Sequence, residues 1–279
     1  MDDISIERMR ISTALKMVDV AACTVFIWDY LLTLGMEVEY VWPGRWTIIK
    51  AVYLLQRYLP FIDTLWIALH VLFGTNLSPT MCSRLNAAGR SLMCLGLASS
   101  ELILTLRAWA VWDRNRDLGI ILQILFAACF LPTAPILYVF LKSVEYIDLP
   151  PPTEGCIPVA GKQIIIVNWA LLLVWDALIL ILMAIPAFHS FRFKNNSSLY
   201  RAVYTEGISY YLYLFIISTL NIVLSGLTSV DMSYRFVVIT MSRCFHSLLT
   251  SRVLLHIRAS NDKDMAQEST EVVLVDMVP

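Results

Sequence analysis

The stretch LGIILQILFAACFLPTAPILYVFL, residues 118–141, decides the class of fold. It contains no charged residue, and it is longer than the roughly 10–14 residues of a helix buried in a soluble core. The strands of a membrane barrel would show short segments of alternating polarity instead. A hydrocarbon core about 30 Å thick needs roughly 20 apolar residues per helix. The stretch therefore predicts a membrane-spanning helix.

The composition of the whole chain indicates the same class. Of its 279 residues, 58% are hydrophobic and only 15% are charged. Soluble domains have about 45–50% hydrophobic and about 25% charged residues, so this chain has too few charged residues to cover the surface of a soluble globule. A formal net charge of −1 provides no basic field for nucleic acid. We expect an all-α, polytopic integral membrane protein whose main partner is the lipid bilayer.

Apolar runs of similar length recur along the chain and predict a seven-transmembrane-helix bundle. The connections between them are too short for a separate soluble domain. We therefore expect one transmembrane domain over residues 1–257 and a flexible cytosolic tail over residues 258–279. The seven runs cover approximately residues 11–34, 47–73, 89–112, 118–142, 163–187, 207–227 and 234–256.

Positive charges in short loops predict the orientation of such a bundle. If the N-terminus is outside, more Lys and Arg residues face the cytosol than the outside, among them Arg114, Arg116 and Arg192. This excess favours an external N-terminus and a cytosolic C-terminus. We expect the protein in the plasma membrane or the secretory pathway.

Two of the six cysteines, Cys82 and Cys156, lie in loops that both face the outside in this orientation. Disulfides persist on that oxidising side. A Cys82–Cys156 bridge would tie the loop between the fourth and fifth predicted helices to the start of the third. Seven-helix receptors commonly use that arrangement, whereas the alternative is two unpaired neighbours. We predict the bridge.

A group of ionisable and polar side chains falls at membrane depth. A charge near the bilayer centre costs roughly 2.5–3.5 kcal/mol on insertion scales, so such residues usually face the bundle interior and pair. We expect one network, with pairings such as Arg57–Glu101 and Arg243–Asp63. It is a candidate ligand, ion or proton site, and the alternative is a set of ion pairs that hold helices in register. Its members are Arg57, Asp63, Glu101, Asp176, Asn221 and Arg243, with His246 at similar depth.

Sequence patterns of catalysis and of cofactor binding are missing. The chain has no HExxH, no GxSxG and no Gly-rich phosphate loop. Its four histidines lack the spacing with acids or cysteines that a metal site requires. The predicted seventh helix has no lysine for a retinal Schiff base. We expect no enzyme activity, no cofactor and no metal.

The third predicted helix ends in Trp112-Asp113-Arg114. An Asp-Arg pair at a cytosolic helix end is similar to the acidic-Arg lock of rhodopsin-like receptors. The NPxxY and CWxP patterns of that class are absent from the seventh and sixth predicted helices. Coupling to G proteins through this lock is therefore not expected.

The most distinctive part of the chain is the segment from residue 18 to residue 63. It contains DYLLTL at residues 29–34, EVE at 37–39, WP at 42–43 and RYLPFID at 57–63. This segment resembles the N-terminal domain of unknown function of a large family of fungal integral membrane proteins, abundant in mushroom-forming fungi. Residues 102–112 and the Arg-Asn-Arg that follows resemble the third helix and inner loop of that family. The resemblance implies a seven-helix membrane protein without an assigned activity.

The same segment has a physical interpretation of its own. We expect Glu37 and Glu39 in a short inner loop, where they can pair with Arg45 and Lys50 at the headgroup boundary. Asp29 lies within reach of Lys50 or Arg57. This hairpin is expected to act as a structural clasp or to dock a cytosolic partner.

Three functions remain open at the level of sequence. The leading hypothesis is a receptor-like sensor of a small-molecule ligand that acts through its inner loops on a cytosolic signalling partner. The second is a small-solute or proton-coupled transporter that works through Asp63, Glu101, Asp176 and Arg243. The third is a membrane scaffold whose polar network is purely structural.

Overall fold

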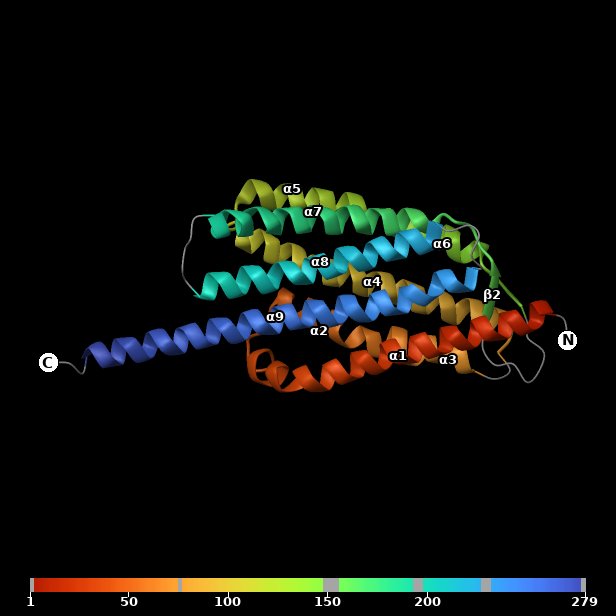
Figure 1. Cartoon of the computed structure of the whole chain (residues 1–279), viewed down its shortest axis with the longest axis horizontal. Helices are drawn as coiled ribbons and strands as arrows, with labels where there is room; N and C mark the ends of the chain where they lie inside the picture. Colours follow the sequence, from red (N-terminus) through yellow and green to blue (C-terminus); the bar gives the residue numbers. More distant parts are fainter. Residues whose placement is uncertain (1–2, 75–76, 148–155, 193–197, 227–231, 277–279) are drawn as a thin grey trace.

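A computed structural model describes residues 3–74, 77–147, 156–192, 198–226 and 232–276. Over this part of the chain the helices lie roughly along one long axis and form an elongated bundle (Figure 1). The N-terminus lies at one end of the bundle and the C-terminus beyond the other (Figure 1). We call these two ends the N-end and the C-end.

Seven helical rods make up the described part of the chain, and they follow the seven apolar runs. Five rods are continuous, and two are interrupted. The rod that begins with α2 continues through a π-helical segment, η1, into α3, and the rod that begins with α5 turns at residues 131–132 into α6. The bounds are α1 Asp3–Tyr40, α2 Ile48–Pro60, η1 Phe61–Ala68, α3 Leu69–Phe73, α4 Pro79–Val111, α5 Arg116–Phe130, α6 Thr133–Ser143, α7 Ile165–Arg192, α8 Ser198–Gly226 and α9 Met232–Asp276.

Five helices among the described residues are long and apolar enough to cross a membrane. They cover Lys16–Tyr40, Pro79–Val111, Arg116–Ser143, Ile165–Phe188 and Ile208–Gly226. The remaining two rods carry buried charged side chains, which lower their hydropathy. The all-α class and the membrane-embedded character of the protein are thus confirmed, and the count of seven crossings and the orientation stay predictions.

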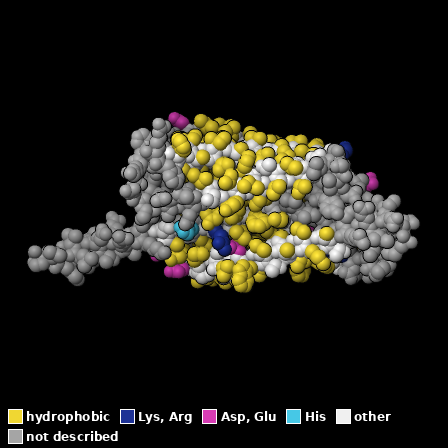
Figure 2. All heavy atoms as spheres, viewed as in Figure 1, with side chains coloured by type: hydrophobic (Ala, Val, Ile, Leu, Met, Phe, Trp, Pro, Cys, Tyr) yellow, Lys and Arg dark blue, Asp and Glu magenta, His cyan; other side chains and the backbone are white. Residues whose placement is uncertain are grey.

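The surface of the bundle suits a lipid environment. Hydrophobic side chains form a broad band over the middle of the face seen in Figure 2. Large apolar side chains such as Trp66, Ile124 and Leu131 are exposed in the chain alone. In a soluble protein, an apolar surface of this extent would cause association, whereas lipid tails cover it here.

A small β-hairpin closes the N-end between α6 and α7. Strand β1 (Glu145–Ile147) pairs antiparallel with β2 (Ile157–Ala160). Cys156, just before β2, is joined by a disulfide to Cys82 in the first turn of α4, with Cα atoms 5.8 Å apart. The Cys156 amide also donates a 2.9 Å hydrogen bond to the Val71 carbonyl of α3. The hairpin is therefore fixed to two neighbouring rods.

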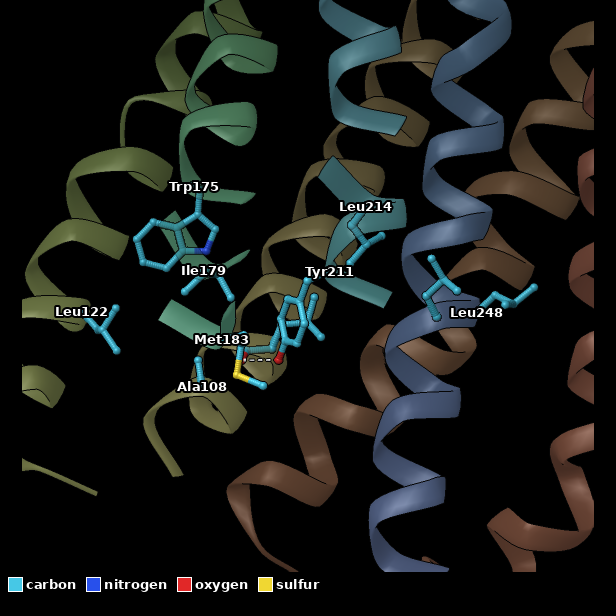
Figure 3. Packing of buried hydrophobic residues seen from close by; sticks show 10 residues of the cluster. Ala108, Leu122, Trp175, Ile179, Met183, Tyr211, Leu214 and Leu248 are labelled. Atoms are coloured by element: carbon cyan, nitrogen blue, oxygen red, sulfur yellow. Dashed lines mark hydrogen bonds between the residues drawn. The ribbon is translucent and has the colours of Figure 1, made fainter. Parts of the chain in front are cut away.

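The largest apolar core lies between α4, α5, α7, α8 and α9. Trp175, Ile179 and Met183 lie one turn apart on α7, so they present one continuous apolar stripe (Figure 3). Tyr211 of α8 is buried among them and donates its hydroxyl to the Leu104 carbonyl of α4 at 3.2 Å (Figure 3). This core holds the five helices at fixed positions around the polar residues described below.

Two prolines inside helices have their broken hydrogen bonds replaced by neighbouring helices. A proline has no amide hydrogen, so it leaves the carbonyl four residues earlier without its helical donor. For Pro60 this is the Gln56 carbonyl, which accepts a 3.1 Å bond from the Ser247 hydroxyl of α9. For Pro186 it is the Leu182 carbonyl, which accepts a 2.9 Å bond from the Trp112 indole. Such replacement is what allows proline at membrane depth.

Two regions near the C-end differ from expectation. Residues 258–276, expected as a tail, continue α9 as one helix that projects beyond the bundle (Figure 1). Asp113 and Arg114 both have φ of 55°, so they form a left-handed turn after α4. An Asp-Arg lock requires the pair on the helix itself, and the turn removes that likeness to rhodopsin-like receptors.

Candidate functional site: a buried polar column along helix α9

One face of α9 carries the polar side chains around which the site is built. They recur at spacings of three and four residues, which places them on one stripe of the helix. Helix α9 packs against α1, α2, α4 and α8, so the stripe faces the bundle interior. Its members are at most 5% exposed: Thr240, Ser242, Arg243, His246, Ser247, Thr250 and Ser251. Their partners on the other helices form three levels.

The N-side level is the pair Asp63–Arg243. The Arg243 Nε donates to Asp63 Oδ2 at 3.0 Å, and both side chains are fully buried. The Thr64 hydroxyl donates to the other oxygen of Asp63 at 2.6 Å. This is the Arg243–Asp63 pairing that the sequence predicts. Gly96 of α4 lies so close that a Cβ there would overlap the Arg243 guanidinium.

The middle level consists of His246, Glu101 and Asp176 from α9, α4 and α7. The His246 Nδ1 lies 3.0 Å from Glu101 Oε1, and the Glu101 and Asp176 carboxyl groups are in contact. The Ser218 hydroxyl of α8 donates to Asp176. Four helices thus meet at one point, and all three ionisable side chains are at most 4% exposed.

The C-side level is a larger cluster: Asp29, Glu37, Arg57 and Arg252. The Arg57 Nε donates to Glu37 Oε2 at 3.0 Å, and its Nη1 lies 4.0 Å from Asp29. The Arg252 Nε of α9 donates to the other Asp29 oxygen at 2.5 Å. The cluster therefore joins α1, α2 and α9 by two acids and two guanidinium groups.

Further bonds hold the α1–α2 hairpin on either side of this level. The Tyr58 hydroxyl and the Trp42 indole both donate to Glu37 Oε1, at 2.8 Å and 3.3 Å. The Lys50 ammonium donates to the carbonyls of Trp42 and Gly44, at 2.9 Å and 2.7 Å. Lys50 therefore closes the connecting loop by capping its backbone.

Two sequence-based expectations about this hairpin are wrong. Glu37 is not in a loop but in the last turn of α1, fully buried, and its partner is Arg57 rather than Arg45 or Lys50. The Arg57–Glu101 pairing does not form, because Arg57 lies at the C-side level and Glu101 at the middle one. Helical depth counted from sequence placed these two residues too close along the bundle axis.

A glutamine connects the helices between the middle and C-side levels. The Gln56 amide donates to the Ser251 hydroxyl at 2.9 Å, and its oxygen accepts from the Ser100 hydroxyl at 3.4 Å. One side chain of α2 thereby contacts both α9 and α4. These neutral bonds continue the polar column without adding charge.

A separate chain of polar side chains lies next to the β-hairpin at the N-end. The Asn86 amide donates to the Tyr146 hydroxyl of β1, and the Arg90 Nε donates to the Asn86 oxygen at 3.2 Å. The Arg90 charge acts in turn on Asp19 of α1. Burial raises the pKa of the Tyr146 phenol, so the phenol stays neutral and keeps its hydroxyl hydrogen at all physiological pH values.

The six residues selected from sequence are all buried but do not form one network. Arg57, Asp63, Glu101, Asp176 and Arg243 divide among the three levels, as given above. Asn221 is 1% exposed, and its amide donates to the Ile217 carbonyl of its own helix at 3.2 Å. Among the described residues, its amide thus bonds to the backbone of α8 itself.

Sequence reasoning did not select Asp29, Glu37, Arg252 and Ser218 as site residues. One signal was present: Asp29, Thr33 and Glu37 recur every four residues, which places them on one face of a helix. Thr33 accepts a 2.5 Å bond from the Arg57 Nη2, so that face is the one that binds Arg57.

Within the described residues, no group of three or more His, Cys, Asp or Glu side chains is arranged to hold a metal ion.

Residues 17–62 match the family model described as "Family of unknown function (DUF6533)". The chain carries a DUF6533 domain near its N-terminus. The matched residues cover most of α1, the loop after it and α2, so the DUF6533 segment is the hairpin that Arg57, Glu37 and Lys50 hold together. No curated protein matches the chain.

Proposed function

We propose that this protein is a receptor-like membrane sensor rather than an enzyme. In this proposal seven helices cross the bilayer, the N-end faces outside, and the DUF6533 hairpin and the end of α9 face the cytosol. A small-molecule ligand acts at the N-end, and a cytosolic signalling partner reads the C-end. The observation that carries the proposal is the polar column, which extends along α9 from the Asp63–Arg243 level to the DUF6533 hairpin.

The column suits signal transmission because two of its three levels are discrete ion pairs. A buried pair either keeps its partner or loses it at high cost, so each of these two levels favours a small number of arrangements. All three levels include a side chain of α9, so a shift of this helix would change all three together.

The Cys82–Cys156 disulfide supports the same orientation. It ties the β-hairpin to α4, and disulfides persist in oxidising compartments such as the secretory pathway and the cell surface. We therefore place the N-end outside the cytosol and the protein in the plasma membrane or the secretory pathway. Because the hairpin is fixed to α4, a ligand that displaces the hairpin would also displace α4.

Hydrogen exchange measured by mass spectrometry tests this coupling on the whole protein in nanodiscs. Reduction of the disulfide perturbs only the N-end directly. We expect amides of residues 41–47, at the opposite end, to exchange several-fold faster after reduction. The double variant Cys82→Ala, Cys156→Ala is the control, because its exchange should not respond to the reductant. A change confined to residues 144–160 would overturn the sensor and favour a scaffold.

A second candidate is proton-coupled transport, which the middle level favours. No Lys or Arg forms an ion pair with Glu101 or Asp176 among the described residues, and groups of Asp, Glu and His at membrane depth are typical of proton relays. Purified protein in liposomes with an internal pH dye distinguishes the two functions. A transporter would dissipate an imposed pH gradient faster than empty liposomes, whereas a sensor would not.

A further inference from the structure

The middle level of the column differs from the other two in its charge. The N-side and C-side levels pair each acid with a guanidinium group. The middle level brings together two acids and one imidazole, and among the described residues its only basic partner is His246. Glu101 Oε1 and both His246 nitrogens are buried without a hydrogen bond of good geometry. Glu101 Oε1 and the unprotonated one of the two imidazole nitrogens can therefore accept a hydrogen bond or a proton.

Simple charge counting shows that this group holds a variable number of protons. Two carboxyl groups in contact and away from water are not both ionised, because like charges repel strongly there. At least one proton therefore lies on the Glu101–Asp176 pair. With a neutral imidazole, one proton leaves a net charge of −1, and a second proton makes the group neutral.

The neighbouring charged side chains do not neutralise the remaining negative charge of the middle level. Arg243, one turn away on α9, acts on His246 but donates to Asp63 of η1. From α8, Tyr211 lies near Glu101, and its hydroxyl donates to a backbone carbonyl. From α4, the Arg107 guanidinium lies over the Tyr211 ring, 5.7 Å from its centroid. Among the described residues of α7, Asp176 is the acid that faces the group.

We propose that His246, Glu101 and Asp176 form a proton-binding centre whose ligand is the hydrogen ion itself. One proton from solvent binds to the remaining carboxylate of the Glu101–Asp176 pair, and the 3.0 Å contact between Glu101 and His246 is then a hydrogen bond from a carboxylic acid to the neutral imidazole. The charge of the centre rises by one, and no other group is consumed or released. Since the three residues belong to α9, α4 and α7, proton uptake tightens the contact among these helices.

The inference deepens the proposed function, on which it rests for its consequence. In a sensor, the bound proton would select one arrangement of α9. Ser218 has a positioning role, because its hydroxyl donates to Asp176 and so fixes the orientation of that carboxyl group. The centre itself requires only the three ionisable side chains.

Infrared difference spectroscopy of the whole protein in nanodiscs detects the proton directly. Spectra at about pH 5 and about pH 8, a window in which a carboxyl group buried away from water can titrate, should differ reversibly in the carboxylic-acid C=O stretching region, because the added proton turns a carboxylate into a carboxylic acid. We expect Glu101→Gln and Asp176→Asn each to remove this difference. Glu39→Gln, at an exposed position in the last turn of α1, is the matched control and should keep it. Ser218→Ala should shift the acid band without removing it. This variant provides the test if Glu101→Gln and Asp176→Asn do not fold.

The possible results separate the two proposals. No acid band that depends on pH, or one that both Glu101→Gln and Asp176→Asn retain, overturns the proton-binding centre. If the exchange coupling between the two ends persists in that case, the sensor stands without it. If the band titrates while the exchange of residues 41–47 ignores both pH and reductant, the centre stands and the sensor is overturned.

Discussion

Arg243 is a residue whose position depends on what α4 lacks. Its guanidinium lies against Gly96, where any side chain would occupy the same space. Asp63 holds the group there by a 3.0 Å bond. The ion pair therefore depends on the absence of a Cβ at Gly96, even though glycine has no polar side chain to contribute.

We expect Gly96→Ala to destabilise the protein. The added methyl group would push the Arg243 guanidinium away from Asp63, and such overpacking costs about 1–3 kcal/mol in a well-packed interior. The thermal unfolding midpoint of the purified protein in detergent measures the effect, and it should fall.

Gly35→Ala provides the matched control for this prediction. A Cβ at Gly35 of α1 meets nothing within 4 Å, so only helix propensity changes, in favour of Ala by roughly 1 kcal/mol. Its unfolding midpoint should rise or stay level. Equal midpoints for the two alanine variants would show that the space beside Arg243 is not needed.

At the scale of elements, the interrupted rod α2–η1–α3 is held by its neighbours. Pro60 ends α2, and the π-helical η1 begins directly after it with Asp63 in its first turn. Ser247 of α9 supplies the hydroxyl that the Gln56 carbonyl needs. The bend and the direction of Asp63 are thus shared properties of two helices.

A double-mutant cycle on Pro60 and Ser247 tests this dependence. Ser247→Ala alone leaves the buried Gln56 carbonyl without a donor, which costs about 1–3 kcal/mol. In the Pro60→Ala background a backbone amide is available to that carbonyl, so the same Ser247→Ala change should cost clearly less. Unfolding midpoints of the four proteins give the coupling energy. Additive effects would mean that the hydroxyl does not replace the missing amide.

The elements were more predictable from sequence than their contacts. Hydropathy located all seven rods, because the bilayer imposes a length and a polarity on each helix. It identified Arg57 and Glu101 as buried, but it could not say which faces of which helices meet. The three levels depend on the rotation and the axial shift of each helix, and packing across five or more helices sets both. Asn221 illustrates the limit, since a buried amide can equally serve its own backbone.

At the scale of the whole molecule, the two ends have opposite characters. The N-end is closed by a disulfide-bound hairpin, and the C-end carries the DUF6533 loop and the extension of α9. This polarity predicts that the N-terminus is external and the C-terminus cytosolic.

Epitope tags at the two termini of the chain test the orientation. Protease added to intact cells should cut the N-terminal tag and leave the C-terminal tag until the membrane is permeabilised. Glycosylation gives an independent check, because Asn195 and Asn196, outside the described residues, belong to sequons that should stay unmodified in the cytosol. A glycan on either residue would show that the true orientation is the reverse of the predicted one.

The length of α9 gives the three levels a mechanical consequence. The helix has 45 residues, about 68 Å at about 1.5 Å per residue, whereas the hydrocarbon core is about 30 Å thick. In the proposed sensor, residues 258–276 would therefore act as a lever arm whose pivot lies inside the bundle. A slight tilt at the height of His246 becomes a several-fold larger sweep at the tip. A change as small as one proton or one broken ion pair would then be visible to anything that touches the far end of the arm.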